Sequence, residues 1–305
     1  MTAMASSFTT SFTTGFTTGF TTGFTTGFTS GVIGHDSHDH NGMTDTTILH
    51  AVDGGVMRIT LNRPAVLNSF DLEMGRQLQA VLARAADDRA VRAVLITGAG
   101  RAFCAGQDLG SVSLDDPAAR PDLGNVVREL WNPIVRQLRA LEKPVVAAVN
   151  GVAAGAGANL ALACDIVLAS KTASFIQAFS KLGIIPDSGG TFFLPRLVGM
   201  ARATALTFLA EKVSADQAMA WGMIWRVCEP EALMTDAEQL ALQLAQQPTR
   251  GFALTKQALN ASMTHDLAAQ LDLEEALQRQ AGGTHDFVEG VKAFLEKRAP
   301  EFRGE

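Results

Sequence analysis

Two glycine-rich turns, each directly after an apolar segment, most constrain the fold of this chain. They run from Arg101 to Leu109 (R-A-F-C-A-G-Q-D-L) and from Asn150 to Leu160 (N-G-V-A-A-G-A-G-A-N-L). The segments before them, Val91–Thr97 and Val145–Val149, are nearly all apolar, which is typical of strands covered on both faces of a sheet. The pattern predicts an α/β fold whose buried strands end in turns with accessible backbone N–H groups. The turns alone are equally compatible with loose strand–helix connections or a phosphate cradle.

Hydrophobic periodicity predicts strand–turn–helix units followed by a region that is helical from Ala232 onward. Two capping boxes are expected to begin helices, Ser214 with Gln217 and Asp286 with Glu289. The other expected elements are a hairpin over Ile48–Asn62 with its turn at Asp53-Gly54-Gly55, a helix marked by Leu72 to Ala85, a helix over Asn125–Leu141, a short helix within Ala154–Cys164 and a strand over Asp165–Ala169.

Composition excludes several classes of function. Net charge is −6, so no broad basic face for nucleic acid is expected. No apolar run reaches the ~18 residues of a membrane span. The three cysteines include no C-x-x-C pair, which favours a reducing cytoplasm over disulfides or zinc. Cys104 lies in the first turn, but no histidine occurs between His50 and His265 to activate it, and we expect a packing residue.

Residues 1–42 differ from the remainder of the chain. An F-T-T-G repeat places phenylalanine at every fourth position, and a His/Asp run follows at 35–40. Such low-complexity sequence has no means of forming a core, so we expect a disordered tail, or upstream sequence that is not translated when Met43 is the true start. The His/Asp run is either solvated tail or a metal-binding tract. The expected domains are the tail (1–42), an α/β core (43–245) and a C-terminal helical region (246–305).

The segment Leu182–Thr191 (L-G-I-I-P-D-S-G-G-T) places one acidic side chain, Asp187, before an expected helix. This aspartate is either an N-cap that accepts a hydrogen bond from the helix backbone or a general base that carries a proton. Two turns with N–H donors and one carboxylate are the groups that enolate formation on a thioester requires, because the oxyanion needs preorganised donors. Our working hypothesis is the base.

The motifs resemble the crotonase (enoyl-CoA hydratase/isomerase) superfamily from about Ile48 to the C-terminus. The resemblance rests on motifs that match in order and spacing: Leu61-Asn-Arg-Pro64, Ala102–Leu109, Asn150-Gly151, Ile185-Pro186, Gly189-Gly190-Thr191 and Glu289–Arg298. Within the family, Phe179–Thr191 is similar to the branch that isomerises ring-1,2-epoxyphenylacetyl-CoA in phenylacetate catabolism. The resemblance implies a spiral of repeated ββα units with a helical C-terminal trimerisation region, and a homotrimer or a pair of trimers.

The resemblance also implies site residues. The oxyanion-hole N–H groups fall on Gln107 and Ala156, although the hydratases have glycine at the second position. An acyl-CoA substrate is expected to contact Ala105, Gly106, Gln107, Asp108, Asn159 and Lys297, with Asp108 beside the adenine and Lys297 reaching coenzyme A, often from a neighbouring subunit. Lys297 is also readable as a solvated charge, and Asn159 as a packing residue. No cofactor and no metal is implied, because coenzyme A is part of the substrate.

The acid–base groups depart from the hydratase pattern. Hydratases hold and deprotonate a water with two glutamates, and these positions carry Asn159 and Phe179 here. Asp187 stands where the isomerases place their aspartate. The resemblance therefore implies an isomerase of aryl-derived acyl-CoA that forms an oxepin. The alternatives are a Δ3,Δ2-enoyl-CoA isomerase, a dehalogenase with Asp187 as nucleophile, and a non-catalytic acyl-CoA-binding scaffold.

Overall fold

A computed structural model describes residues 46–110 and 121–305 of the protein. Asp45–Glu305 form one compact unit. The expected tail over 1–42, with its repeat and its His/Asp run, lies outside the described residues. No helix in the described ranges has the length and apolar character needed to cross a membrane.

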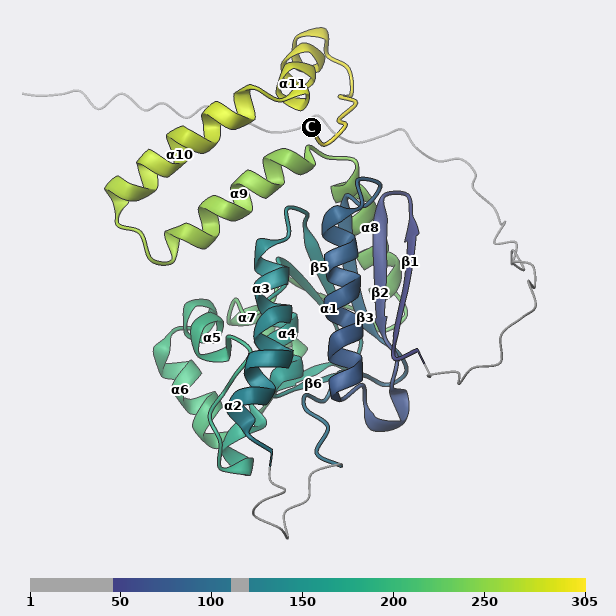
Figure 1. Ribbon diagram of the computed structural model, residues 1–305, viewed down its shortest axis with the longest axis vertical. Coiled ribbons are helices and arrows are strands. Elements are labelled where there is room, and N and C mark those ends of the chain that lie inside the picture. The colour runs from purple at the N-terminus through teal and green to yellow at the C-terminus, as the bar shows by residue number, and fades with distance from the viewer. Residues whose placement is uncertain (1–45, 111–120) are drawn as a thin grey trace, which may run out of the picture. The chain divides into compact units, whose positions relative to one another are not determined.

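A six-stranded sheet forms the centre of this unit (Figure 1). Its first two strands pair antiparallel through the expected hairpin, and Gly54 and Gly55 in the turn have φ of 56° and 81°. These values belong to a two-residue hairpin turn that glycine adopts without strain. All other neighbours in this sheet are parallel. In spatial order the strands are β1 (Ile48–Asp53), β2 (Val56–Leu61), β3 (Ala93–Gly98), β5 (Val145–Val149), β7 (Ile166–Ser170) and β10 (Arg226–Cys228).

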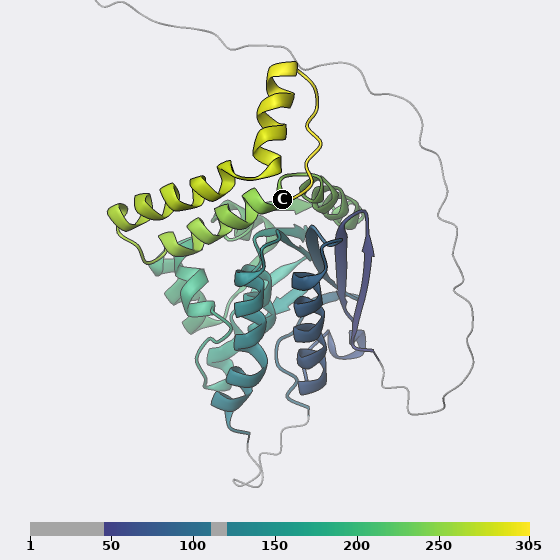
Figure 2. The same cartoon turned by 45° about the horizontal axis from the view of Figure 1, so that its top comes forward.

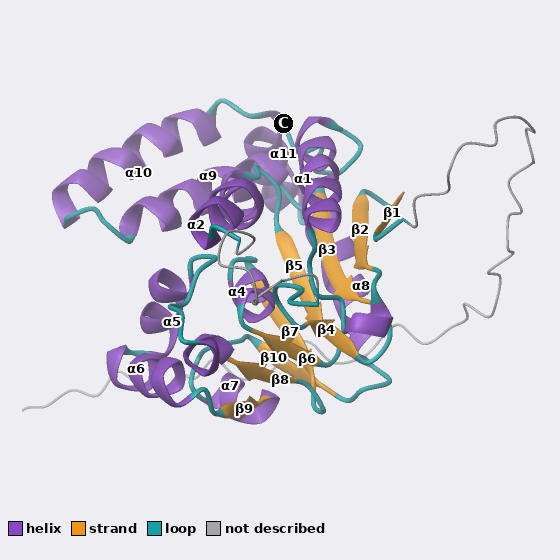
Figure 3. Ribbon diagram, turned by 60° about the horizontal axis from the view of Figure 1, so that its bottom comes forward, coloured by secondary structure: helices purple, strands orange, loops and turns teal. Residues whose placement is uncertain are grey.

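A second sheet is built from shorter strands that follow β3, β5 and β7 along the chain (Figure 3). In spatial order these are β4 (Ala102–Cys104), β6 (Val152–Ala154), β8 (Ser174–Ile176) and β9 (Lys212–Ser214). Each pair of a long and a short strand is followed by helical structure. The expected repeat of strand–strand–helix units is confirmed.

Helices cover both faces of the larger sheet. Alternate residues of β3 face opposite ways, so that Val94 and Ile96 join one core while Ala93 and Leu95 join the other. The first core contains α1 (Leu72–Asp87) and the second α8 (Leu233–Ala245), on opposite sides of the sheet in Figure 1. The other helices are α2 (Leu123–Val126), α3 (Asn132–Ala140), α4 (Ala156–Leu162), α5 (Gly190–Val198), α6 (Met200–Leu209), α7 (Ala215–Ala220), α9 (Thr249–Ser262), α10 (Leu267–Gly282) and α11 (His285–Glu296).

One of the two expected capping boxes is correct. Ser214 and Gln217 exchange both bonds at the start of α7. The expected box of Asp286 and Glu289 is wrong, because Thr284 caps α11 by accepting from the Phe287 N–H. The Asp286 carboxylate instead accepts from the N–H groups of Arg303 and Gly304, at 2.7 Å each. The local sequence shows the spacing of a capping box. It does not show that residues 303 and 304, near the C-terminus, fold back to bind Asp286.

The two glycine-rich turns approach each other closely enough to exclude side chains. A Cβ at Gly157 would lie 2.3 Å from the Cys104 carbonyl oxygen, and one at Gly106 would lie 2.9 Å from the Ala154 oxygen. Both distances are shorter than real Cβ contacts allow. Glycine at these positions therefore lets β4 and its turn pack directly on the beginning of α4.

Gly157→Ala is expected to lower the free energy of unfolding by about 1–3 kcal/mol, because the added methyl group overpacks a backbone contact. Gly282→Ala in α10 is the matched control, since its Cβ would meet nothing within 4 Å. That substitution should leave stability unchanged or raise it by up to about 1 kcal/mol. Urea denaturation measures both, and equal stabilities of the two variants would contradict the packing argument.

Candidate active site

The first turn presents the Gln107 N–H. It follows β4 and is held by an isolated parallel bridge between Phe70 and Gln107. In this bridge the Phe70 N–H donates to the Gly106 carbonyl (2.8 Å) and the Asp108 N–H donates to the Phe70 carbonyl (2.9 Å). The Gly106 carbonyl and the Asp108 N–H are thus used in hydrogen bonds to Phe70. The Gln107 N–H between them has no acceptor among the described residues.

The second turn presents the Ala156 N–H at the start of α4. Gly155, the N-cap of this helix, has φ of 53° and no side chain that could cap it. The first N–H groups of a helix lack partners within the helix and lie at the positive end of its dipole. A Cβ at Gly106 would lie 3.4 Å from the Ala156 nitrogen, so the two turns are in contact.

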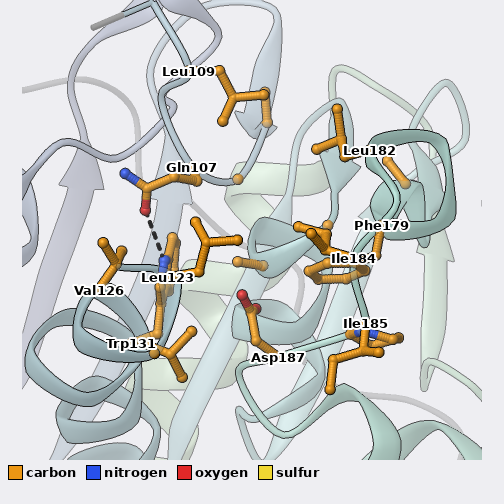
Figure 4. Close-up of a pocket in the computed structure, with 18 residues that line it drawn as sticks. Gln107, Leu109, Leu123, Val126, Trp131, Phe179, Leu182, Ile184, Ile185 and Asp187 are labelled. Carbon is orange, nitrogen blue, oxygen red and sulfur yellow. Dashed lines mark hydrogen bonds between the residues drawn. The ribbon is translucent and has the colours of Figure 1, made fainter. Parts of the chain in front are cut away.

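Both turns open into one cavity of about 580 Å³ (Figure 4). Five of the predicted site residues line it: Ala105, Gly106, Gln107, Ala156 and Asp187. Among the residues that the structure describes, Asp187 is the one ionisable residue that lines the cavity, and Figure 4 shows its carboxylate directed into it. Most of the remaining wall is apolar and includes Leu123, Val126, Trp131, Phe179, Ile184 and Ile185.

Asp187 lies in the loop before α5 and does not cap that helix. The N-cap is Gly189, and no side chain supplies a capping bond. Burial in the apolar wall raises the pKa of the Asp187 carboxyl, while the hydrogen bond from Ser188 and its own backbone N–H act in the opposite direction. The Ser188 hydroxyl donates to Asp187 Oδ1 at 2.9 Å. The capping interpretation is therefore wrong, and the carboxylate is available to the cavity.

Ser188 itself has an uncommon backbone conformation. Its φ is 51°, in the left-handed region, and its side chain is buried. Residues other than glycine in this region carry strain, which the surrounding structure must maintain. Ser188 lies directly after Asp187, and in this conformation its hydroxyl donates a hydrogen bond to the Asp187 carboxylate.

Asn159, expected to contact substrate, lies instead behind the cavity wall. It is fully buried in α4 and is not among the lining residues. Its Nδ2 donates to the Asp187 carbonyl (2.9 Å), and its Oδ1 accepts from Gln177 Nε2 (2.9 Å). Both ends of the amide thus bond to protein groups, which favours the packing interpretation that the sequence left open over a contact with substrate.

Asp108 and Lys297, the other two expected coenzyme A contacts, do not line this cavity. Asp108 Oδ2 forms an ion pair with Arg63 at 2.9 Å, and Oδ1 accepts from the Gly110 N–H. Lys297 is exposed at the C-cap of α11. Figures 1 and 2 place α11 at the opposite end of the compact unit from α2, which borders the cavity.

Trp131 is a cavity residue that the sequence did not indicate. Its Nε1–H donates to Gln107 Oε1 at 3.0 Å, and its ring packs on Phe70 with centroids 4.8 Å apart. It ends a π-helical turn, Val127–Trp131, inside the helix expected over 125–141. Such turns occur often at functional sites, but helical periodicity does not reveal them.

Cys104 lies beneath the first turn and is fully buried. Burial raises the pKa of its thiol to about 12, so the thiolate is not formed near neutral pH. The expectation that Cys104 is a packing residue is confirmed. Asp187 thus remains the candidate for chemistry in the cavity.

Comparison with known proteins identifies relatives along nearly the whole described chain. The sequence model of the enoyl-CoA hydratase/isomerase family matches residues 51–305. The 1,2-epoxyphenylacetyl-CoA isomerase of Escherichia coli (strain K12) is 55% identical over 257 residues, which are 84% of this chain and 98% of that protein. A probable enoyl-CoA hydratase of Rhodobacter capsulatus is 45% identical over 262 residues, 86% of this chain and 100% of that protein.

The fold is also found among solved structures. A putative enoyl-CoA hydratase/isomerase from Mycobacterium abscessus superposes with a TM-score of 0.80 at 37% identity, over 85% of this chain and 100% of that one. The expected fold class is therefore confirmed.

Ser188→Ala should raise the pKa of the Asp187 carboxyl further, because it removes a hydroxyl donor that favours the charged form. The carboxyl is protonated below its pKa and ionised above it. A raised pKa therefore moves the midpoint of the titration to higher pH. Carbon-13 NMR of aspartate-labelled protein measures it. Ser188→Gly relieves the backbone strain yet should shift the midpoint the same way. A midpoint unchanged or lowered in both variants would show that the hydroxyl does not tune this carboxyl.

Proposed function

The chain belongs to the enoyl-CoA hydratase/isomerase family, and on this premise we propose that it isomerises an aryl-derived acyl-CoA. The proposed reaction converts ring-1,2-epoxyphenylacetyl-CoA to the oxepin. The observation that supports it most is the Asp187 carboxylate, the one carboxylate that the described residues direct into this apolar cavity. The backbone N–H groups of Gln107 and Ala156, which have no acceptor among the described residues, reach the same cavity. The 55% identity to the Escherichia coli 1,2-epoxyphenylacetyl-CoA isomerase supports this choice of substrate.

The proposed chemistry begins at the acyl α-carbon. The Asp187 carboxylate removes a proton there, the C–H electron pair forms the enolate double bond, and the thioester oxygen becomes an oxyanion. The N–H groups of Gln107 and Ala156 stabilise that oxyanion as it forms. The bond between the two epoxide carbons breaks as the ring expands. The thioester carbonyl re-forms as the enolate electrons shift into the ring, and Asp187 returns the proton to the ring carbon that receives them. Substrate and product therefore have the same composition.

The environment of Asp187 suits a group that both accepts and returns a proton. Burial raises the pKa of this carboxyl, so its protonated form is more accessible than that of an ordinary aspartate, which suits a group that must hold a proton and return it. Phe179 and Trp131 supply aromatic walls for an aryl group.

Migration of an aliphatic β,γ double bond is the second candidate. It requires the same two donors and the same single base, and the family contains isomerases as well as hydratases. Product identification with the ring epoxide and with a 3-enoyl-CoA distinguishes the two. An acyl-CoA-binding scaffold without catalysis would convert neither.

We also propose that the protein works as a homotrimer or a pair of trimers in the cytoplasm. Phe294, Leu295 and Leu267 in the C-terminal helices are each at least 74% exposed, an unusual exposure for large apolar side chains. Lys297 lies far from the cavity of its own chain, so a contact with coenzyme A would be made in a neighbouring subunit. Light scattering of the purified protein measures the mass, and a monomer would contradict this arrangement.

Asp187→Asn is expected to lower turnover of the ring epoxide by about 10²- to 10⁴-fold, because it removes the base while keeping the shape of the side chain. Acyl-CoA affinity should change little. The loss of epoxide absorbance, with identification of the product, measures activity. Asp216→Asn, at an exposed position of α7, is the matched control and should retain full turnover. Retention of more than a tenth of wild-type turnover by Asp187→Asn would disprove the role of the base.

Hydration of crotonyl-CoA should be negligible in the wild-type protein. Water addition needs one group to activate water and another to protonate the α-carbon, and each positioned group contributes about 10²- to 10⁴-fold. Phe179 lines the cavity without a polar atom, and the amide of Asn159 is occupied behind the wall. A hydratase rate within tenfold of the isomerase rate would contradict the assignment. This measurement is needed because a relative that is 45% identical, from Rhodobacter capsulatus, is named a probable enoyl-CoA hydratase.

A further inference from the structure

Helix α4 carries two residues of interest within one turn. Ala156 is its first residue and offers an N–H to the cavity, whereas Asn159 lies three residues later, is fully buried and is not among the residues that line the cavity. Residues three apart lie on neighbouring positions of a helix surface. A group bound to Asn159 is therefore held at a fixed distance from the Ala156 amide.

Asn159 binds the loop that carries Asp187. The Asp187 carbonyl accepts two hydrogen bonds, from Asn159 Nδ2 at 2.9 Å and from the Gly190 N–H at 2.8 Å. Together these use both lone pairs of the carbonyl oxygen. One bond closes the turn within the loop, and the other attaches this turn to α4.

The Asp187 carbonyl determines which way the Asn159 amide is turned, because a carbonyl only accepts hydrogen bonds, and Gln177 supports that orientation from the other end. Gln177 lies between β8 and the 3-10 turn Ala178–Leu182, it is 5% exposed, and its Nε2 donates to Asn159 Oδ1 at 2.9 Å. With the amide reversed, Asn159 would face the Asp187 carbonyl with its oxygen and Gln177 with its NH₂ group. Two oxygens would then meet at the Asp187 end, whichever way the Gln177 amide is turned, so the Asp187 carbonyl permits one orientation of Asn159.

Gly190 allows the loop to lie directly on this amide. A Cβ at Gly190 would be 2.3 Å from Asn159 Nδ2, so no larger residue fits there without displacement. Close packing blocks movement of the loop toward α4, and the hydrogen bond opposes movement away from it. The strained φ of Ser188, 51°, is maintained inside the same turn.

We propose that Asn159 is a positioning residue that fixes Asp187 relative to the Ala156 amide, and that Gln177 acts through it. The inference rests on the proposed function, in which Asp187 is the base and Ala156 an oxyanion donor. A base must stand within hydrogen-bond reach of the proton it takes, and a displacement of about 1 Å costs on the order of 10²-fold in rate. Binding of acyl-CoA does not depend on this tether.

The test compares Asn159→Leu, Gln177→Leu and the double variant with wild type, using the ring epoxide of phenylacetyl-CoA. Leucine keeps most of the buried volume and removes the hydrogen bonds. Asn159→Leu should lower kcat by about 10- to 100-fold with KM changed less than threefold. Gln177→Leu should lower kcat by less. The double variant should equal Asn159→Leu, because Gln177 acts through Asn159.

Leu162→Ala, at a buried position of the same helix, is the control for lost stability alone. It should lower the melting temperature and leave kcat per folded molecule unchanged. If Asn159→Leu does not fold, Asn159→Ser replaces it, since serine is too short to keep the tether.

The outcomes separate the two proposals when Asp187→Asn is assayed alongside. An active Asp187→Asn enzyme overturns the proposed function. An inactive Asp187→Asn enzyme together with an Asn159 variant whose kcat stays within twofold of wild type overturns the positioning role alone. Additive effects of the Asn159 and Gln177 substitutions overturn the claim that Gln177 acts through Asn159.

Discussion

The close contact between the two glycine-rich turns is the constraint on which the site depends. Gly157 lies against the Cys104 carbonyl and Gly106 against the Ala154 carbonyl, at separations that leave no room for a Cβ. Parallel pairing of β4 with β6 brings the turns to the same edge. Two N–H groups from segments some fifty residues apart in sequence, those of Gln107 and Ala156, thereby converge on one cavity. A rigid backbone scaffold of this kind needs no reorganisation when charge develops on a substrate oxygen.

The apolar wall has opposite effects on the two halves of the proposed chemistry. Low polarity strengthens the interaction of the amides with an oxyanion. The same low polarity disfavours the ionised form of Asp187 and raises its pKa. The Ser188 hydroxyl offsets part of that cost by donating to Oδ1. The left-handed backbone of Ser188 is thus coupled to the ionisation of its neighbour, and strain in the loop supports a functional group.

Local pattern was sufficient for the hairpin, the buried strand β3, the glycine turns and the position of Asp187, because each depends on residues close together in sequence. It failed where distant segments decide the outcome. The Asn159 side chain bonds residues 18 and 28 positions away, and Asp286 binds amides 17 and 18 positions away. The π-helical turn that directs Trp131 toward Gln107 leaves the apolar spacing of a helix almost intact. These features follow from tertiary contacts that no window of sequence contains.

The two positions that carry glutamate in hydratases are not equivalent in this fold. Phe179 forms part of the cavity wall, so a carboxylate placed there would reach the substrate. A carboxylate at Asn159 would instead meet the Asp187 carbonyl, and it would have no N–H with which to bind it. Gly190, packed on the same amide, leaves no space for the larger side chain to turn aside. Asn159, which holds the loop that carries Asp187, therefore occupies one of the two positions at which a hydratase needs glutamate. Conversion of this protein to a hydratase would require that loop to move first.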